Sequence, residues 1–181
     1  DCKGMLRVTP RPSLVICPGG GYRHVGKREG EPIALAFMPL GFNCFILDYS
    51  VAPHRYPQAL KELCSLVELI HKNAELWNID TSRIVLCGFS AGGHLAGSYC
   101  TMRARPEITE DYPLRSIAGA ILGYSVVSAD PSVGHMNSFY NQQYYDDVWE
   151  RADCGNGHRY AFNTEDNFIH VFNHFARHYR G

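Results

Sequence analysis

The 181-residue sequence lacks a strong charge of either sign, a long apolar run and closely paired cysteines. Its 17 Lys and Arg residues nearly balance 18 Asp and Glu residues, so the net charge of −1 creates no field that would attract nucleic acid or an anionic membrane. No apolar run approaches the ~20 residues of a membrane-spanning helix. The seven cysteines form no C-x-x-C pair, which argues against a metal cluster or a dithiol redox centre. We therefore expect no nucleic-acid partner, no membrane insertion and no bound metal.

The composition that is present fits a globular protein that folds around a core of its own. Hydrophobic residues make up 45% and charged residues 19% of the chain, which are ordinary values. At this length we expect one domain over residues 1–181. Cys17, Cys44 and Cys87 fall inside apolar runs, where a thiol behaves as a small hydrophobe. Reduced thiols favour a cytoplasmic location. A secreted or periplasmic protein whose leader has been removed is the alternative, because the first residue is Asp1.

The stretch around Ser90 combines a strand, a tight turn and a helix. Residues 84–87 form an apolar, β-branched run that is typical of a buried parallel strand. The sequence Gly-Phe-Ser-Ala-Gly follows at residues 88–92, and helix-forming residues come next. This order predicts a turn so sharp that a Cβ at either flanking glycine would meet the strand or the helix. The Ser90 hydroxyl would then stand at the start of a helix, whose dipole favours developing negative charge.

A glycine run at residues 18–22, Pro-Gly-Gly-Gly-Tyr, is the second feature of interest. Three successive glycines leave backbone N–H groups that an anion can approach. A phosphate-binding loop would end in G-K-[ST], and a dinucleotide site would have the spacing G-x-G-x-x-G; the run has neither. The loop therefore fits an oxyanion-binding role better than a nucleotide-binding role.

Apolar runs alternate with helical patterns, which predicts an α/β fold with a three-layer αβα sandwich and a mostly parallel sheet. A polar turn is expected at residues 80–82. The carboxyl ends of parallel strands are where such sheets bind ligands, and residues 18–22, 48–49, 90 and 125 each follow a strand end. The predicted strands are residues 14–17, 42–47, 84–87 and 117–122, and the predicted helices are residues 31–39, 57–77 and 91–104.

These motifs resemble the α/β-hydrolase superfamily, specifically its small acetyl-esterase and acetylxylan-esterase-like branch, which is related to the hormone-sensitive-lipase type. The resemblance covers roughly residues 13–138 and is carried by residues 18–22, 48–53 (Asp-Tyr-Ser-Val-Ala-Pro) and 88–96 (Gly-Phe-Ser-Ala-Gly-Gly-His-Leu-Ala). It implies a trimmed α/β-hydrolase fold and a serine esterase that acts on small acyl esters, such as acetate on a sugar or a small alcohol.

By position, the resemblance makes Ser90 the nucleophile and the backbone N–H groups of Gly20, Gly21 and Ala91 the oxyanion hole. It implies a two-step acyl transfer that needs no cofactor. His94 is expected to be a packing or hydrogen-bonding residue rather than the base, because it follows Ser90 by four residues on the same helix.

The base and the acid follow from the family's order, in which the serine precedes the acid and the acid precedes the histidine. The resemblance assigns the base to His158, in a Gly-Asn-Gly-His sequence before the last predicted helix. Asp147 is the closest match to the acid, although it stands only 11 residues before His158, too close for the strand, helix and strand that the family places there. Asp130, just beyond the fourth predicted strand, is the rival acid.

This shortened segment leaves two alternatives open. The protein could be a trimmed, non-catalytic relative that binds a small ligand or a partner, or another serine hydrolase such as a peptidase, thioesterase or arylformamidase. Missing strands would expose a sheet edge, which residues 139–163 or a second subunit would cover, so a homo-oligomer is one expected arrangement. The last predicted helix carries three histidines spaced by four without an acidic companion, and we interpret them as a solvated face rather than a metal site: His170, His174 and His178.

Overall fold

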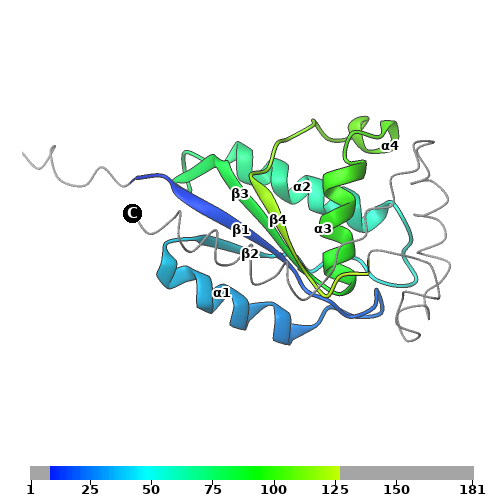
Figure 1. Cartoon of the computed structure of the whole chain (residues 1–181). Helices are drawn as coiled ribbons and strands as arrows, with labels where there is room; N and C mark the ends of the chain where they lie inside the picture. Colours follow the sequence, from blue (N-terminus) through cyan, green and yellow to red (C-terminus); the bar gives the residue numbers. More distant parts are fainter. Residues whose placement is uncertain (1–8, 127–181) are drawn as a thin grey trace, which may run out of the picture.

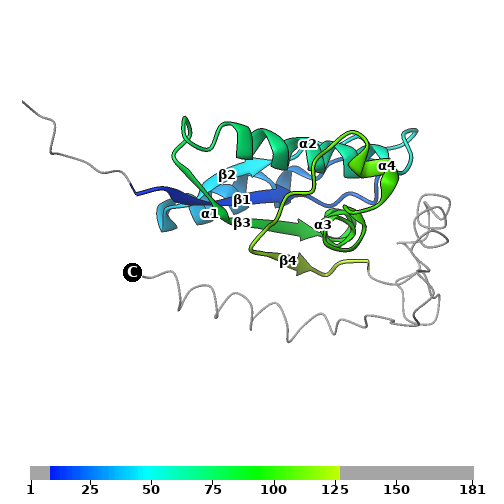
Figure 2. The ribbon, with the colours of Figure 1, turned by 90° about the horizontal axis from the view of Figure 1, so that it is seen from above.

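The centre of the structure, a computed structural model that describes residues 9–126, is a sheet of four strands (Figures 1 and 2). All three neighbouring pairs are parallel, so the four carboxyl ends meet at one edge. We call this edge, which carries residues 18–22, 48–50, 90 and 124–125, the Ser90 edge. The order across the sheet is β2 (Asn43–Ile46), β1 (Arg11–Cys17), β3 (Ile79–Phe89) and β4 (Gly119–Gly123).

Helices cover both faces of the sheet, which confirms the predicted αβα sandwich (Figure 1). One face carries α1 (Glu31–Phe37), and the other carries α2 (Gln58–Lys72) and α3 (Ala91–Met102). No helix within residues 9–126 combines the length and the apolar character needed to cross a membrane. Three short elements complete this part of the chain: η1 (Lys27–Glu29), η2 (Met38–Leu40) and α4 (Pro106–Thr109).

The central strand β1 contributes to the core on both faces. Successive side chains of a strand point to opposite faces. Leu14 and Ile16 accordingly pack in the core beside α1, whereas Val15 and Cys17 pack in the core beside α2 and α3. A strand that is buried on both faces has a continuous apolar sequence, which is why this strand could be predicted from residues 14–17.

The helix α2 lies on the sheet through one apolar stripe and ends earlier than its pattern predicts. The apolar spacing continues to Trp77, but the helix stops at Lys72. Asn73 closes it, because both its backbone N–H and its side-chain amide donate to the carbonyl of Leu69, at 3.1 and 2.9 Å. The buried apolar residues of the stripe follow helical spacing: Ala59, Leu60, Leu63, Cys64, Val67 and Ile70.

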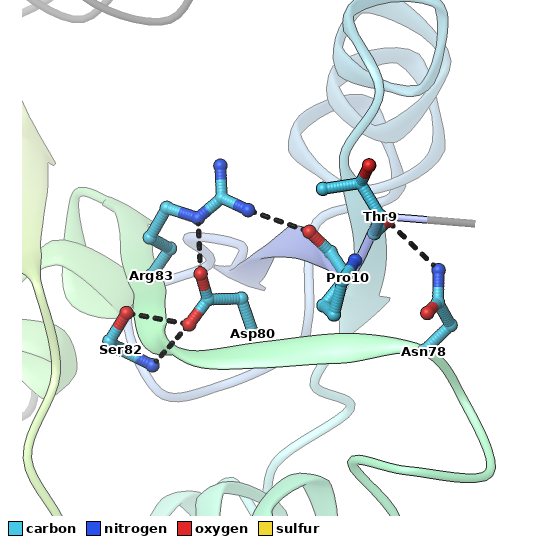
Figure 3. Close-up of polar contacts among 6 residues, drawn as sticks. All are labelled: Thr9, Pro10, Asn78, Asp80, Ser82 and Arg83. Carbon is cyan, nitrogen blue, oxygen red and sulfur yellow. Dashed lines mark hydrogen bonds and ion pairs between the residues drawn. The ribbon is translucent and has the colours of Figure 1, made fainter. Parts of the chain in front are cut away.

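The start of β3 differs from the prediction of a polar turn at residues 80–82, because these residues lie within the strand. Arg11 pairs with Ile79 and Ser13 with Ile84, so two steps along β1 match five along β3. Asp80 holds the extra residues: its carboxylate accepts the Ser82 N–H (2.9 Å), the Ser82 hydroxyl (2.6 Å) and the Arg83 Nε–H (2.7 Å) (Figure 3). The polar residues thus form a bulge in the strand rather than a connection before it.

Candidate active site

Ser90 joins β3 to α3 with φ 51° and ψ −117°. This backbone conformation is sparsely populated for residues with a side chain and costs about 1–3 kcal/mol. The Ser90 N–H donates to the carbonyl of Gly123 at the end of β4 (2.9 Å), and the Ser90 carbonyl accepts the N–H of His94 (3.0 Å). The turn is therefore held both by the sheet and by the first turn of α3. Strain that is held in place by its surroundings is typical of functional sites.

The two glycines that flank this turn occupy places where no side chain fits. A Cβ on Gly88 would lie 2.2 Å from the carbonyl oxygen of Gly92, so strand and helix approach each other closely there. A Cβ on Gly92 would lie 1.9 Å from the carbonyl oxygen of Cys17 at the end of β1. The first contact confirms that a flanking side chain would meet the helix. The second shows that the neighbouring strand β1 is what excludes a side chain at Gly92.

The side chain of Ser90 does not cap α3, although the residue occupies the N-cap position. A serine at this position usually accepts a hydrogen bond from a backbone N–H of the first turn. Its hydroxyl is therefore not used by the helix, and the residue is half-buried. Ala91 is the first residue of α3, and its N–H is one of the initial amides that have no carbonyl partner within a helix. The predicted oxyanion donor Ala91 thus adjoins Ser90 at the positive end of the helix dipole.

The glycine loop lies against the Ser90 turn. A Cβ on Gly19 would be 3.0 Å from the Cβ of Ser90, so the two backbones are in close contact. Gly20 and Gly21 follow with φ of 140° and 60°, and the Gly20 carbonyl accepts the N–H of Arg23 (3.0 Å). The fold therefore brings Gly20 and Gly21, the other two predicted oxyanion donors, to the same edge as Ser90.

Tyr22 anchors the end of the glycine loop to α3. Its side chain is 1% exposed, and its hydroxyl is hydrogen-bonded to Nδ1 of His94 at 2.8 Å. The Tyr49 hydroxyl donates to the carbonyl of Pro18 at the start of the loop (2.6 Å). Burial lowers the pKa of His94 to about 4, so the imidazole is neutral near pH 7. His94 is thus a buried hydrogen-bonding residue of α3, as its position in the sequence predicted.

Glu29, which was not singled out from the sequence, lies at the same edge and contacts Tyr124, which belongs to a Gly-Tyr pair at residues 123–124 that also resembles the esterase branch. Oε2 of Glu29 accepts the N–H of Gly19 (2.5 Å), and Oε1 accepts the hydroxyl of Tyr124. Although the residue is exposed, partial desolvation of its hydroxyl and the hydrogen bond with this carboxylate raise the pKa of the Tyr124 phenol. Glu29 belongs to a charged run, Lys-Arg-Glu at residues 27–29, whose composition is typical of a solvent-exposed loop. Only the tertiary structure shows that its carboxylate contacts the glycine loop.

The predicted base and both predicted acids, His158, Asp147 and Asp130, lie outside the described residues. Within residues 9–126, no group of three or more His, Cys, Asp or Glu side chains could hold a metal ion.

Two other strand-end residues are at the predicted edge: Asp48 is exposed after β2, and Ser125 is buried after β4.

Known proteins resemble the chain in sequence and in structure. The profile of a family with the alpha/beta hydrolase fold matches residues 18–177. Endo-1,4-beta-xylanase B of Butyrivibrio fibrisolvens is 33% identical over an alignment of 138 residues, and the match covers 65% of this chain and 20% of that protein. An acetylxylan esterase of Xylanibacter ruminicola is 28% identical over an alignment of 133 residues, and the match covers 71% of this chain and 25% of that one. The crystal structure of a carboxylesterase from Lactobacillus plantarum matches with a TM-score of 0.70 and 31% identity, over 83% of this chain and 58% of its own.

The chain spans a quarter or less of these two curated relatives. The family profile nevertheless covers most of the chain, from the start of the glycine loop to the predicted last helix. The parallel sheet, the glycine loop and the turn at Ser90 agree with that match. The chain belongs to the family of proteins with the alpha/beta hydrolase fold.

Proposed function

We propose that this protein is a serine esterase that hydrolyses small acyl esters, with Ser90 as the nucleophile. The observation that carries the proposal is the turn at Ser90. A strained residue begins α3, its hydroxyl does not cap the helix, and the glycine loop packs against it. The names of two similar proteins, an acetylxylan esterase and a carboxylesterase, support the same class of reaction.

In the proposed first step, Ser90 Oγ attacks the carbonyl carbon of the ester and its proton passes to His158. The carbonyl oxygen becomes an oxyanion, which accepts hydrogen bonds from the N–H groups of Ala91, Gly20 and Gly21. The intermediate then breaks its bond to the alcohol oxygen, and the alcohol leaves with the proton from His158. An acyl group remains on Ser90.

In the second step, a water molecule gives a proton to His158 and attacks the acyl carbon. The second tetrahedral intermediate releases the carboxylic acid and restores the Ser90 hydroxyl. An aspartate, Asp147 or Asp130, would hold the imidazole in the tautomer that accepts the proton. The reaction needs no cofactor. Acetyl esters of carbohydrates are the substrates we propose, because one similar protein is an acetylxylan esterase.

Fluorophosphonate labelling and hydrolysis of p-nitrophenyl acetate test the proposal. Ser90→Ala should abolish labelling and lower kcat/KM by more than about 10³-fold, because the nucleophile is lost. Ser65→Ala is the matched control, since Ser65 is an exposed serine on α2 and its loss should change neither readout.

Wild-type protein that is neither labelled nor active would contradict the proposal, as would turnover that survives Ser90→Ala. Acetylated xylo-oligosaccharides, compared with a thioester and a peptide amide, separate the esterase from the other hydrolase classes. Full activity of His158→Ala would remove His158 as the base, and the separate Asp147→Asn and Asp130→Asn variants identify the acid by which one lowers kcat.

A further inference from the structure

The carboxylate of Glu29 connects the two segments that border Ser90. One oxygen accepts the N–H of Gly19 at 2.5 Å, and the other accepts the hydroxyl of Tyr124. Gly19 packs on Ser90, with 3.0 Å between a Cβ built on Gly19 and the Cβ of Ser90. Tyr124 directly follows Gly123, whose carbonyl accepts the Ser90 N–H at 2.9 Å. Glu29 therefore closes a ring of contacts around the Ser90 turn.

The hydrogen bond from the Gly19 N–H to Glu29 also gives the first amide of the glycine loop a different role from the later ones. The Gly19 N–H is directed to Glu29, so an oxyanion would be bound by later residues of the loop, Gly20 and Gly21. Glu29 belongs to η1, which follows the glycine loop in the connection from β1 to α1, and the N–H of Gly26 donates to the Gly19 carbonyl (2.8 Å). The side chain of Glu29 thus ties the start of the glycine loop to η1. Amides stabilise an oxyanion only when they are held in position, and the hydrogen bonds of Glu29 hold the loop that carries them.

The hydrogen bonds of Glu29 indicate that its carboxylate holds the glycine loop in position and does not accept a proton from the substrate. A bare carboxylate close to a developing oxyanion would oppose the charge that forms in the reaction. Here both oxygens accept hydrogen bonds, one from an amide and one from a phenol, and hydrogen bonds to a charged acceptor are stronger than those between neutral groups. The residue is half-buried and its two partners come from segments on either side of Ser90.

We propose that Glu29 is a positioning residue, which fixes the glycine loop against Ser90 and the end of β4 so that the loop amides are held ready for an oxyanion. Its effect on the reaction rate rests on the proposed esterase function, whereas its effect on the loop does not.

The test compares Glu29→Ala, Glu29→Gln and Glu31→Ala in the full chain with two readouts. The first is kcat and KM for p-nitrophenyl acetate, with kcat expressed per active site titrated by fluorophosphonate. The second is amide hydrogen exchange at residues 18–22. Glu31 is the matched control, because it is an exposed glutamate two residues further along the chain.

Glu29→Ala removes both acceptors, and we expect kcat per active site to fall about 10- to 100-fold with little change in KM, because the loop amides are displaced. Exchange at residues 18–22 should become faster, while the rest of the chain keeps its protection. Glu29→Gln keeps an oxygen for the Gly19 N–H, so it should retain most of the kcat and the protection. Glu31→Ala should match the wild type in both readouts.

A Glu29→Ala protein with wild-type kcat and wild-type exchange would overturn the proposal. So would faster exchange over the whole chain with unchanged kcat per active site, which indicates a purely structural residue. If the wild-type protein is neither active nor labelled, the esterase function fails, and the exchange readout still decides whether Glu29 holds the loop.

Discussion

Polar groups have opposite roles at the two ends of the parallel strands, the edge where the strands begin and the Ser90 edge where they finish. At the edge where the strands begin, the Asp80 carboxylate is occupied by Ser82 and Arg83, so these partly exposed side chains satisfy one another and hold a bulge (Figure 3). At the Ser90 edge, the backbone of Ser90 is strained, and the backbones at Gly88 and Gly92 approach their neighbours too closely for a side chain to fit. The Ser90 hydroxyl does not cap its helix. At the first edge the polar contacts only stabilise the bulge, so we expect substitutions there to have small effects on stability and none on activity. The second has a strained backbone, which costs stability, and a Ser90 hydroxyl that its helix does not use.

Gly92→Ala should have the largest effect, because its Cβ would lie 1.9 Å from the carbonyl oxygen of Cys17 and 2.4 Å from that of Pro18. Both neighbours are backbone atoms, so the strand end or the helix must move. We expect the free energy of unfolding to fall by about 3 kcal/mol or more in a urea titration. Gly97→Ala on the same helix is the control, since its nearest neighbour would be a side-chain atom of Leu122 at 3.8 Å. That variant should gain about 0.5–1 kcal/mol, and equal losses in both would contradict the close approach.

His94 should make the Ser90 edge sensitive to pH. Its pKa is about 4 in the folded protein and ~6.5 in the unfolded chain. Between these values the unfolded chain binds a proton that the folded protein does not. The stabilisation is therefore complete above about pH 6.5, falls as the pH drops towards 4, and levels off below that, for a total loss of up to about 3 kcal/mol.

Urea midpoints measured from pH 4 to 7 check this pH dependence. His94→Gln has no titrating ring, so it should lack this part of the slope, while carboxylate contributions such as that of Asp80 remain. An identical slope in wild type and variant would show that His94 is not the group responsible.

Tyr22→Phe should have a smaller effect, because it removes only the hydroxyl that pairs with Nδ1 of His94. Loss of one partner of a buried hydrogen bond should lower the free energy of unfolding by about 1–2 kcal/mol. The glycine loop would also lose one of its ties to α3. Thermal unfolding and exchange at residues 18–22 measure the two consequences, and a variant as stable and as protected as the wild type would contradict this role for the hydroxyl.

Asp80→Ala at the opposite edge should have the smallest effect. Its side chain is 31% exposed, and ion pairs in such positions contribute about 1 kcal/mol or less. We expect a loss of that size in urea unfolding and no change in the hydrolysis of p-nitrophenyl acetate. A larger loss than that of Gly92→Ala would reverse the ranking of the two edges.

Most of the fold could be predicted from local patterns. Strands buried on both faces have continuous apolar sequences, and the run at residues 14–17 therefore indicated the centre of the sheet. The bulge at residues 80–82 could not be predicted, because Asp, Thr and Ser in succession usually form a turn. Only the pairing of Ile79 with Arg11 shows that the strand begins before these residues.

The candidate site was predictable where its residues lie in one short motif. The Ser90 turn and the glycine loop each need glycines at fixed positions of a short sequence, so both could be predicted from that sequence. Glu29 was not, because its contacts join residues 10 and 95 positions away and its own neighbours are charged. His158 and the two candidate aspartates remain predictions.

The strand order also determines when the Ser90 turn can form during synthesis. β1 leaves the ribosome first, yet its two neighbours are β2 and β3, so one of its edges stays bare until residue 89 has followed. One contact of the turn requires still more of the chain, since the N–H of Ser90 bonds to the carbonyl of Gly123. A nascent chain that stops short of that glycine carries every residue of the motif at 88–92 but lacks the hydrogen bond that holds Ser90 against β4.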